Sequence, residues 1–275
     1  GGMTHQIAGF IDHEVVVAFV DNLDLSGQGS MGIHAAPLWS QLAFTCPGKA
    51  HGKREGDGML DRPLRFLLRK FHQILVQNRR QDCLAQHLAA LAPSGKIRIL
   101  DVGCGSGQIA ANLQRRLPQS EIHGVDTLVR PETFIPVQAF DGSHLPFEDK
   151  SFDYVMLVDV LHHTHQPPEV LQECLRVARH GVWLKDHLCN SLWDRFRLRC
   201  LDFVGNWGHG VALPYNYLST GQWNQTFEQL GVAPKNWLGR LQLYHPWLAW
   251  LLENHIHFVT HLAPISSDSC KGSKN

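Results

Sequence analysis

The stretch ILDVGCGSGQIA, residues 99–110, is the feature that most constrains how this chain folds. An apolar run ends in an acid, Asp101, and three glycines follow at alternate positions. Glycine lets the backbone turn tightly and approach a ligand where a side chain would block it. The stretch therefore predicts a buried strand, a ligand-binding turn and the start of a helix. In an open α/β sheet the ligand lies at the carboxyl ends of the strands, so we expect a binding site just after residue 101.

Apolar runs and helical patterns alternate after this loop. The predicted strands are 97–101, 121–126, 135–140, 152–158 and 181–186, with two last strands in LGRLQLY (238–244) and IHFVTHLA (256–263). The predicted helices are 107–117, 168–179, 191–204 after a cap at Asn190 or Ser191, and one in STGQWNQTFEQLG (219–231). Strands that alternate with helices favour right-handed crossovers and parallel pairing. The fold class expected is α/β, a doubly wound, mostly parallel, seven-stranded Rossmann-like sheet with a helical and aromatic cap insertion.

The chain divides into four parts by pattern. Residues 1–58 are expected to be an extension, poorly ordered because Gly, Pro, Ser and His accumulate in them without periodicity. The domain is expected at 59–265, and it opens with apolar residues at helical spacing from Pro63 to Leu91. An insertion at about 188–220 is the predicted cap, and 266–275 form a polar tail.

Composition excludes several classes of protein. The 25 basic residues balance 25 acidic ones, so no broad field favours nucleic acid or an anionic membrane. Seven cysteines without a C-x-x-C pair argue against a disulfide framework or a zinc ribbon. The longest early apolar run, residues 15–20, is far shorter than the ~20 residues of a membrane span. We expect a cytoplasmic protein with no integral membrane association, and the sequence leaves its oligomeric state open.

The charge beside the glycine loop distinguishes the possible ligands. A pyrophosphate would be opposed by Asp101, whereas a cationic ligand would suit it. S-adenosylmethionine (SAM) carries an ammonium and a sulfonium and no phosphate. No G-K-[ST] follows the loop, which excludes a P-loop. An NAD(P)-dependent oxidoreductase stays an alternative, because counting from Gly105 gives G-x-G-x-x-A and Asp126 follows the next strand. A SAM-binding regulatory protein without turnover is the other alternative.

Four segments in register carry a resemblance to a known family. They are ILDVGCGSG, IHGVD, DGSHLPFEDKSFDYVMLVDVLHH and LQECLRVAR. From about residue 60 to residue 188 the chain resembles class I SAM-dependent methyltransferases, specifically the methyltransferase type 11 group. The resemblance implies SAM as cofactor and methyl transfer as the reaction.

The resemblance also implies which residues hold the cofactor. It places the backbone of Gly103 and Gly105 against the amino-acid portion of SAM, and Asp101 near its ammonium. Asp126 is similar to the acid that accepts both ribose hydroxyls, and residues 141–143 follow the third strand where the family reads adenine. The cofactor-binding residues expected are Asp101, Gly103, Cys104, Gly105, Asp126, Asp141, Gly142, Ser143 and Val158. Cys104 is interpreted as a small loop residue rather than a nucleophile. The alternative for Asp141 is that it is only a turn residue.

Candidate catalytic groups lie at the ends of the fourth and fifth strands. They are Asp159, His163, Asp186 and His187. Histidine can accept a proton near neutrality, and a neighbouring carboxylate can orient it. A structural role at a helix start is the competing interpretation for His162 and His163. No metal is expected, since neither H-H-x-H at 162–165 nor HIH at 255–257 has zincin spacing.

The cap insertion is expected to choose the acceptor. Its glycines and Pro214 suggest loops that reposition over the site. Tyr215, Asn216 and Tyr217 are the predicted substrate-binding residues, because tyrosine offers an apolar face with a polar tip. The acceptor expected is a small, partly hydrophobic molecule, and no nucleic acid. The competing interpretation is that these aromatic rings only fill the core of the cap.

Overall fold

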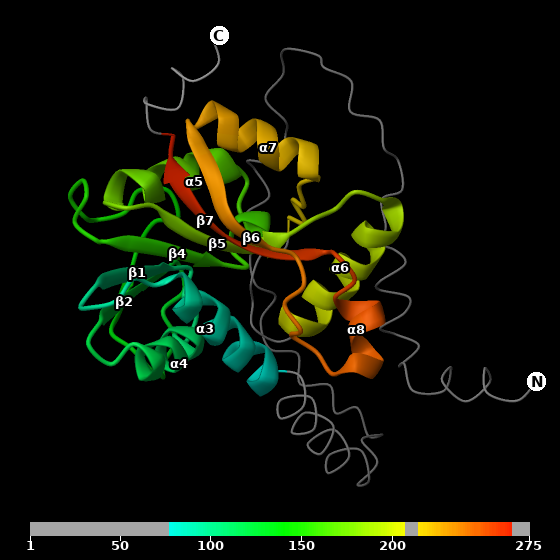
Figure 1. Cartoon of the computed structure of the whole chain (residues 1–275), viewed down its shortest axis with the longest axis horizontal. Helices are drawn as coiled ribbons and strands as arrows, with labels where there is room; N and C mark the ends of the chain where they lie inside the picture. The colour runs from blue at the N-terminus through cyan, green and yellow to red at the C-terminus, as the bar shows by residue number, and fades with distance from the viewer. Residues whose placement is uncertain (1–76, 207–213, 266–275) are drawn as a thin grey trace, which may run out of the picture. The chain divides into compact units, whose positions relative to one another are not determined.

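The computed structural model describes residues 77–206 and 214–265, and these form a seven-stranded sheet in the order β3-β2-β1-β4-β5-β7-β6 (Figure 1). The strands are β1 (Arg98–Val102), β2 (Glu121–Asp126), β3 (Val137–Ala139), β4 (Tyr154–Val158), β5 (Val182–His187), β6 (Val232–Leu238) and β7 (His257–Pro264). Strands β1 to β5 pair in parallel, and β7 runs antiparallel to both β5 and β6. The predicted fold class is confirmed.

Helices cover both faces of this sheet (Figure 1). They are α3 (Arg79–Leu91), α4 (Gln108–Arg116), the 3-10 turn η3 (Leu161–His163), α5 (Pro167–Val177), α6 (Leu192–Asn206), α7 (Thr220–Gln229) and α8 (Pro246–Leu252). Side chains alternate along each strand, so neighbouring residues enter different cores. Leu100 packs in the core that holds α5 and α7, whereas Ile99 packs in the core that holds α3 and α4.

The last part of the chain differs from the sequence prediction. The strand expected at 238–244 is wrong: β6 covers Val232–Leu238 and ends where that strand was to begin. Leu241, Leu243 and Tyr244 are buried against Leu84 of α3 and Val259 of β7, outside any strand. The short helix α8 was not predicted.

Several predictions fall on residues outside the described ranges. They are the extension at 1–58, the first part of the helical pattern after Pro63, the centre of the cap at 207–213 and the tail at 266–275. Within the described part, α6 begins after Ser191, whose Oγ accepts the Asp194 N–H at 3.0 Å and so confirms one of the two predicted caps. None of the helices described here has the length and apolar character needed to cross a bilayer.

Parallel pairing brings the carboxyl ends of β1, β2, β4 and β5 to one edge of the sheet. The glycine loop leaves β1 at this edge, η3 follows β4, and α6 follows β5. The sheet therefore gathers the acids that close each strand, and the residues after them, in one region.

Candidate functional site

The glycine loop is folded against its own sheet. The N–H groups of Gly103 and Cys104 donate to the Val125 carbonyl at 2.8 and 3.2 Å. Gly103, Gly105 and Gly107 all have positive φ, at 72°, 59° and 77°, and L side chains adopt this region only with strain.

The three glycines differ in what surrounds them. A Cβ at Gly103 would lie 2.6 Å from Val160 Cγ2, and one at Gly107 would lie 2.4 Å from Ile135 Cγ1. At Gly105 the nearest atom would be Arg130 Nε at 3.9 Å. Protein packing thus explains Gly103 and Gly107, while Gly105 leaves space for something else to approach the backbone.

Asp101 is a buried acid for which the described residues supply no compensating charge. Only 3% of the residue is exposed, at the end of β1 beneath the loop. Within the described ranges no ion pair or hydrogen bond reaches its carboxylate, and burial together with the charge of Asp126 raises its pKa well above the ordinary value. A cation placed beside Asp101 would remove this penalty.

Asp126 closes β2 and holds the loop in place. One carboxylate oxygen accepts the Gly105 N–H at 2.7 Å, and the other accepts the Leu128 N–H at 2.9 Å. The N–H groups of Gly103 and Gly105 are thus both used inside the protein, so the loop offers a ligand its surface rather than these donors. Each Asp126 oxygen keeps a second lone pair for another donor.

Residues 141–143 form a turn beside Asp126. Asp141 Oδ1 accepts the N–H groups of Ser143 and His144, both at 2.7 Å, and these bonds lower its pKa. Gly142 has φ 86°, and a Cβ there would lie 3.1 Å from Thr127 Cγ2. The turn thus lies against Thr127, the residue that follows Asp126.

Cys104 packs against β2. A Cβ on Gly124 would lie 2.6 Å from Cys104 Sγ, so the two residues fit only because Gly124 has no side chain. Burial and the nearby Asp101 raise the pKa of the Cys104 thiol. It is a thiol at neutral pH rather than a reactive thiolate, in agreement with its interpretation as a small loop residue.

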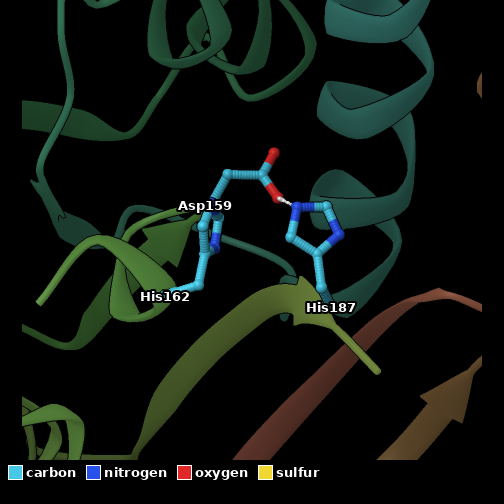
Figure 2. Close-up of side chains that lie close together, drawn as sticks. All are labelled: Asp159, His162 and His187. Carbon is cyan, nitrogen blue, oxygen red and sulfur yellow. Dashed lines mark ion pairs between the residues drawn. The ribbon is translucent and has the colours of Figure 1, made fainter. Parts of the chain in front are cut away.

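Asp159, directly after β4, is an ion-paired acid. Its carboxylate pairs with Arg80 of α3 and with Lys185 of β5, whose side chain is fully buried. Figure 2 shows the same carboxylate facing His187, whose Nε2 lies 3.3 Å away. Burial alone would raise the pKa of Asp159, but Lys185 and Arg80 outweigh it and hold the pKa well below its ordinary value. The ionised carboxylate is therefore a poor general base.

Asp186 accepts three hydrogen bonds from its neighbours. It receives the N–H groups of Leu161 at 3.1 Å and of His187 at 2.8 Å, and it contacts His162 Nδ1 at 2.7 Å. Figure 2 shows His162 next to Asp159 and His187. Asp186 thus fixes the turn after β4 against β5.

His163 and His187 both carry a ring nitrogen with an unmet hydrogen-bonding capacity. Within the described residues the buried Nδ1 atom of each has no hydrogen-bond partner. Burial and the neighbouring His162 lower the pKa of His163 to about 4, while burial and Lys185 hold that of His187 well below its ordinary value. Both imidazoles are neutral at physiological pH, so each keeps a lone pair that can accept a proton, with a basicity below that of an ordinary histidine.

The predicted substrate-binding residues lie next to this group. Asn216 donates its N–H to the His162 carbonyl at 3.1 Å and its side-chain amide to the Thr164 carbonyl at 3.2 Å, so it holds η3. Tyr217 stacks on His162 with ring centroids 5.7 Å apart and meets the His187 ring edge-on at 6.1 Å. Tyr215 has φ 54° and lies under the Arg199 guanidinium.

Three members of this region were not predicted from the sequence. Arg80 comes from α3, Asp202 from α6 accepts the Tyr217 hydroxyl hydrogen bond, and His257 of β7 lies 3.3 Å from the Lys185 ammonium. A signal existed, because β5 reads VWLKDH and is buried at every position. Charges in a fully buried strand require partners from elsewhere in the fold.

Comparison with known proteins agrees with this geometry. Residues 100–184 match the family model described as a methyltransferase domain. This match agrees with the methyltransferase resemblance that the sequence shows over the same residues.

Individual relatives are distant and carry different names. The chain is 27% identical over 143 residues to demethylmenaquinone methyltransferase of Thermotoga maritima, covering 46% of this chain and 62% of that protein. It is 37% identical over 100 residues to phthiotriol/phenolphthiotriol dimycocerosates methyltransferase 1 of Mycobacterium ulcerans, covering 33% of this chain and 36% of that protein. A solved SAM-dependent methyltransferase from Mesorhizobium loti aligns at 16% identity with TM-score 0.49, over 65% of this chain and 96% of that one. The chain thus spans less than two thirds of the length of the two curated relatives.

Proposed function

We propose that the chain is a SAM-dependent methyltransferase that transfers a methyl group to a small, partly hydrophobic acceptor. One observation carries the proposal: Asp101 is a buried carboxylate without a cation among the described residues, directly beneath the glycine loop. The ammonium of SAM is the cation that this position lacks. A dinucleotide would bring phosphate charge to the same acid, which disfavours the oxidoreductase alternative.

The residues present fit SAM at the edge of the sheet. Asp101 would pair with the ammonium, the open face of Gly105 would admit the amino-acid portion, and Asp126 would accept ribose hydroxyls with its remaining lone pairs. Val158 at the end of β4 and the 141–143 turn would border the rest of the nucleoside. When bound, SAM supplies a methyl group activated by its sulfonium.

The acceptor side follows from the residues around β4 and β5. We assign proton acceptance to His163 and His187, because each has an unpartnered ring nitrogen and is neutral at physiological pH. Asp159 and Asp186 are positioning residues in this scheme. Asp159 faces His187 Nε2, and Asp186 fixes His162 and the His187 backbone.

The nature of the acceptor rests on the cap. Tyr217 lies against His187 and Tyr215 lies next to Tyr217, and aromatic rings with polar tips suit a molecule that is part apolar and part polar. The relatives do not narrow the choice of acceptor, because they include a trans-aconitate 2-methyltransferase and a thiol S-methyltransferase.

Calorimetric titration tests the cofactor. We expect saturable binding of SAM and of its demethylated product S-adenosylhomocysteine (SAH) at one site. Asp126→Ala should weaken both by at least about tenfold, since it removes charge-assisted hydrogen bonds of ~1.5–3 kcal/mol each. Failure to bind either ligand, or tight saturable binding of NADH in their place, would contradict the proposal.

Turnover separates an enzyme from a binding protein. The chain should form SAH from SAM only when an acceptor is added, and a panel of thiols, phenols and carboxylic acids with aromatic or alkyl portions samples the chemistry of the cap. His187→Ala should lower kcat while SAH affinity stays within about twofold, because the residue lies on the acceptor side. Equal losses in turnover and in SAH affinity would reject that placement.

A further inference from the structure

A second group of side chains lies beside the proposed acceptor side. It consists of His162, His163 and Asp202, and one ligand atom of each lies within 4.8 Å of the others. His162 and His163 belong to η3, and Asp202 comes from α6. Two imidazoles and a carboxylate make up a ligand set that transition metals use in proteins.

The tautomer of His162 directs a lone pair into this group. Asp186 can only accept, so the 2.7 Å contact requires the hydrogen on Nδ1. Burial lowers the pKa of His162, but the charges of Asp186 and Asp202 outweigh burial and raise it, so a metal ion must displace the Nε2 proton; in the neutral ring Nε2 carries the lone pair. This atom is buried, the residue is 2% exposed, and no hydrogen-bond partner for Nε2 lies among the described residues.

The spacing suits a metal better than a hydrogen bond. His162 Nε2 lies 3.5 Å from Asp202 Oδ2, too long for a good hydrogen bond. Two ligands bound tetrahedrally at ~2.0–2.1 Å are about 3.3–3.4 Å apart. His163 adds a buried Nδ1 that also lacks a partner in the described part of the chain.

The residues behind the group resemble the outer partners of metal ligands. Asp186 orients His162, and a carboxylate that accepts the other ring N–H is the usual partner of a metal-binding histidine. The Tyr217 hydroxyl donates to Asp202 at 2.5 Å and so orients that carboxylate. Both ligands are therefore held in place before any ion arrives.

A neighbouring trio, Asp159, His162 and His187, also has metal-like spacing. Its acid is already paired with Lys185 and Arg80. A metal ion there would have to displace a buried ammonium and a guanidinium from the same carboxylate, which argues against that position.

We propose that His162, His163 and Asp202 bind a zinc-class divalent cation with a fourth coordination position open. The imidazoles favour such a metal over Mg²⁺ or Ca²⁺, which prefer oxygen ligands. The site is independent of SAM binding and goes beyond the proposed reaction. With His163 as a ligand, His187 is left as the proton acceptor. The sequence predicted no metal because Asp202 is distant along the chain from the HH pair.

Metal titration of the full chain tests the site. After treatment with EDTA and its removal, we expect Zn²⁺ to bind with a stoichiometry near one in calorimetry, and Co²⁺ to give the visible absorption of a tetrahedral complex. His163→Ala and Asp202→Asn should each weaken Zn²⁺ binding by at least about tenfold and abolish the Co²⁺ spectrum. His165→Ala is the matched control, because His165 is an exposed histidine two residues from the site.

The outcomes separate this site from the proposed reaction. The site would be overturned if the full chain did not bind zinc. It would also be overturned if all three variants bound zinc with equal affinity, which would mean adventitious binding by other histidines. SAH titration in EDTA runs in parallel, so a protein that binds SAH but not zinc keeps the proposed function and loses the metal site. Thermal melts in EDTA verify that each variant is folded. Zinc affinity that survives both His163→Ala and Asp202→Asn in folded proteins also rejects the assignment.

Discussion

Asp101 shows how a single residue can oppose stability and serve binding. A buried acid whose pKa is raised holds its proton more tightly in the folded chain than in the unfolded chain. Its contribution to stability is therefore lost as pH rises from the ordinary value of 3.8 towards the raised pKa. The fold retains an acid that destabilises it near neutral pH, and the cationic ligand that we propose would account for its retention.

Linkage at Asp101 predicts how SAH affinity depends on pH. The ammonium of SAH should lower the raised pKa of Asp101, so binding should release a proton whenever the pH lies between the bound and free pKa values. Affinity should rise with pH through this window and level off above it. Calorimetry in buffers of different ionisation enthalpy measures the protons released. Asp101→Asn should release none, bind SAH at least tenfold more weakly and melt a few degrees higher without ligand. An Asp101→Asn variant that melts lower would show that the acid has a stabilising partner.

Two glycines offer a matched pair of substitutions. Gly103→Ala places a Cβ 2.6 Å from Val160 at φ 72°, so it should lower both stability and SAH affinity. The Cβ of Gly105→Ala would lie 3.9 Å from its nearest neighbour, Arg130 Nε. The substitution should therefore lower the free energy of unfolding by only ~1–2 kcal/mol, through the strain of the left-handed backbone. It should nevertheless weaken SAH binding by more than about tenfold, because its Cβ points into the space we assign to the cofactor. Urea unfolding and SAH titration of both variants give the comparison, and unchanged SAH affinity in Gly105→Ala would mean that the ligand lies elsewhere.

The elements show which features of sequence predict structure. The positions of Asp101, Asp126 and Asp159 at strand ends could be predicted from the sequence. Parallel pairing brings such strand ends to one edge of the sheet, whatever their side chains contact. Arg80 and Asp202 could not be found this way, because tertiary packing brings α3 and α6 to that edge. Their own sequences give no indication of it.

The errors near the end of the chain have a common cause. The apolar residues Leu241, Leu243 and Tyr244 are spaced roughly as in a strand. Such a pattern indicates which side chains are buried, but it does not show that the backbone forms hydrogen bonds to a neighbouring strand. The true strand β6 is an edge strand that contains Pro234 and is largely exposed, so it lacks the apolar pattern of a central strand.

The ion pairs that join α3, β4 and β5 predict a large effect on stability. Asp159→Asn should lower the free energy of unfolding by ~3–5 kcal/mol, because it leaves the buried Lys185 and Arg80 without their carboxylate. Adding Lys185→Met should restore part of that loss, so the double variant should lose less than the sum of the single variants. Urea unfolding of the four proteins gives the coupling free energy. If Asp159→Asn left the urea midpoint unchanged, the pairing would contribute nothing to stability.

At the scale of the whole molecule, the proposed chemistry is confined to one part of the chain. The seven strands, the glycine loop and the polar residues after β4 and β5 all lie within 77–265. Every proposed cofactor residue lies in the second of the two units into which the chain divides, Gly58–Asn275.

A shortened chain that begins at Gly58 should therefore fold and bind the cofactor. Its sheet keeps both helical layers, and the cores on the two faces are built from residues between Leu84 and Leu262. We expect a cooperative melt within about 4 °C of the full chain, equivalent to roughly 1 kcal/mol for a protein of this size. SAH affinity should stay within about threefold, because Asp101, Gly105 and Asp126 are all retained. Calorimetry and thermal melts of the two chains side by side provide the measurement. Aggregation of the shortened chain, or loss of its SAH binding, would show that residues 1–57 complete the core or the cofactor site.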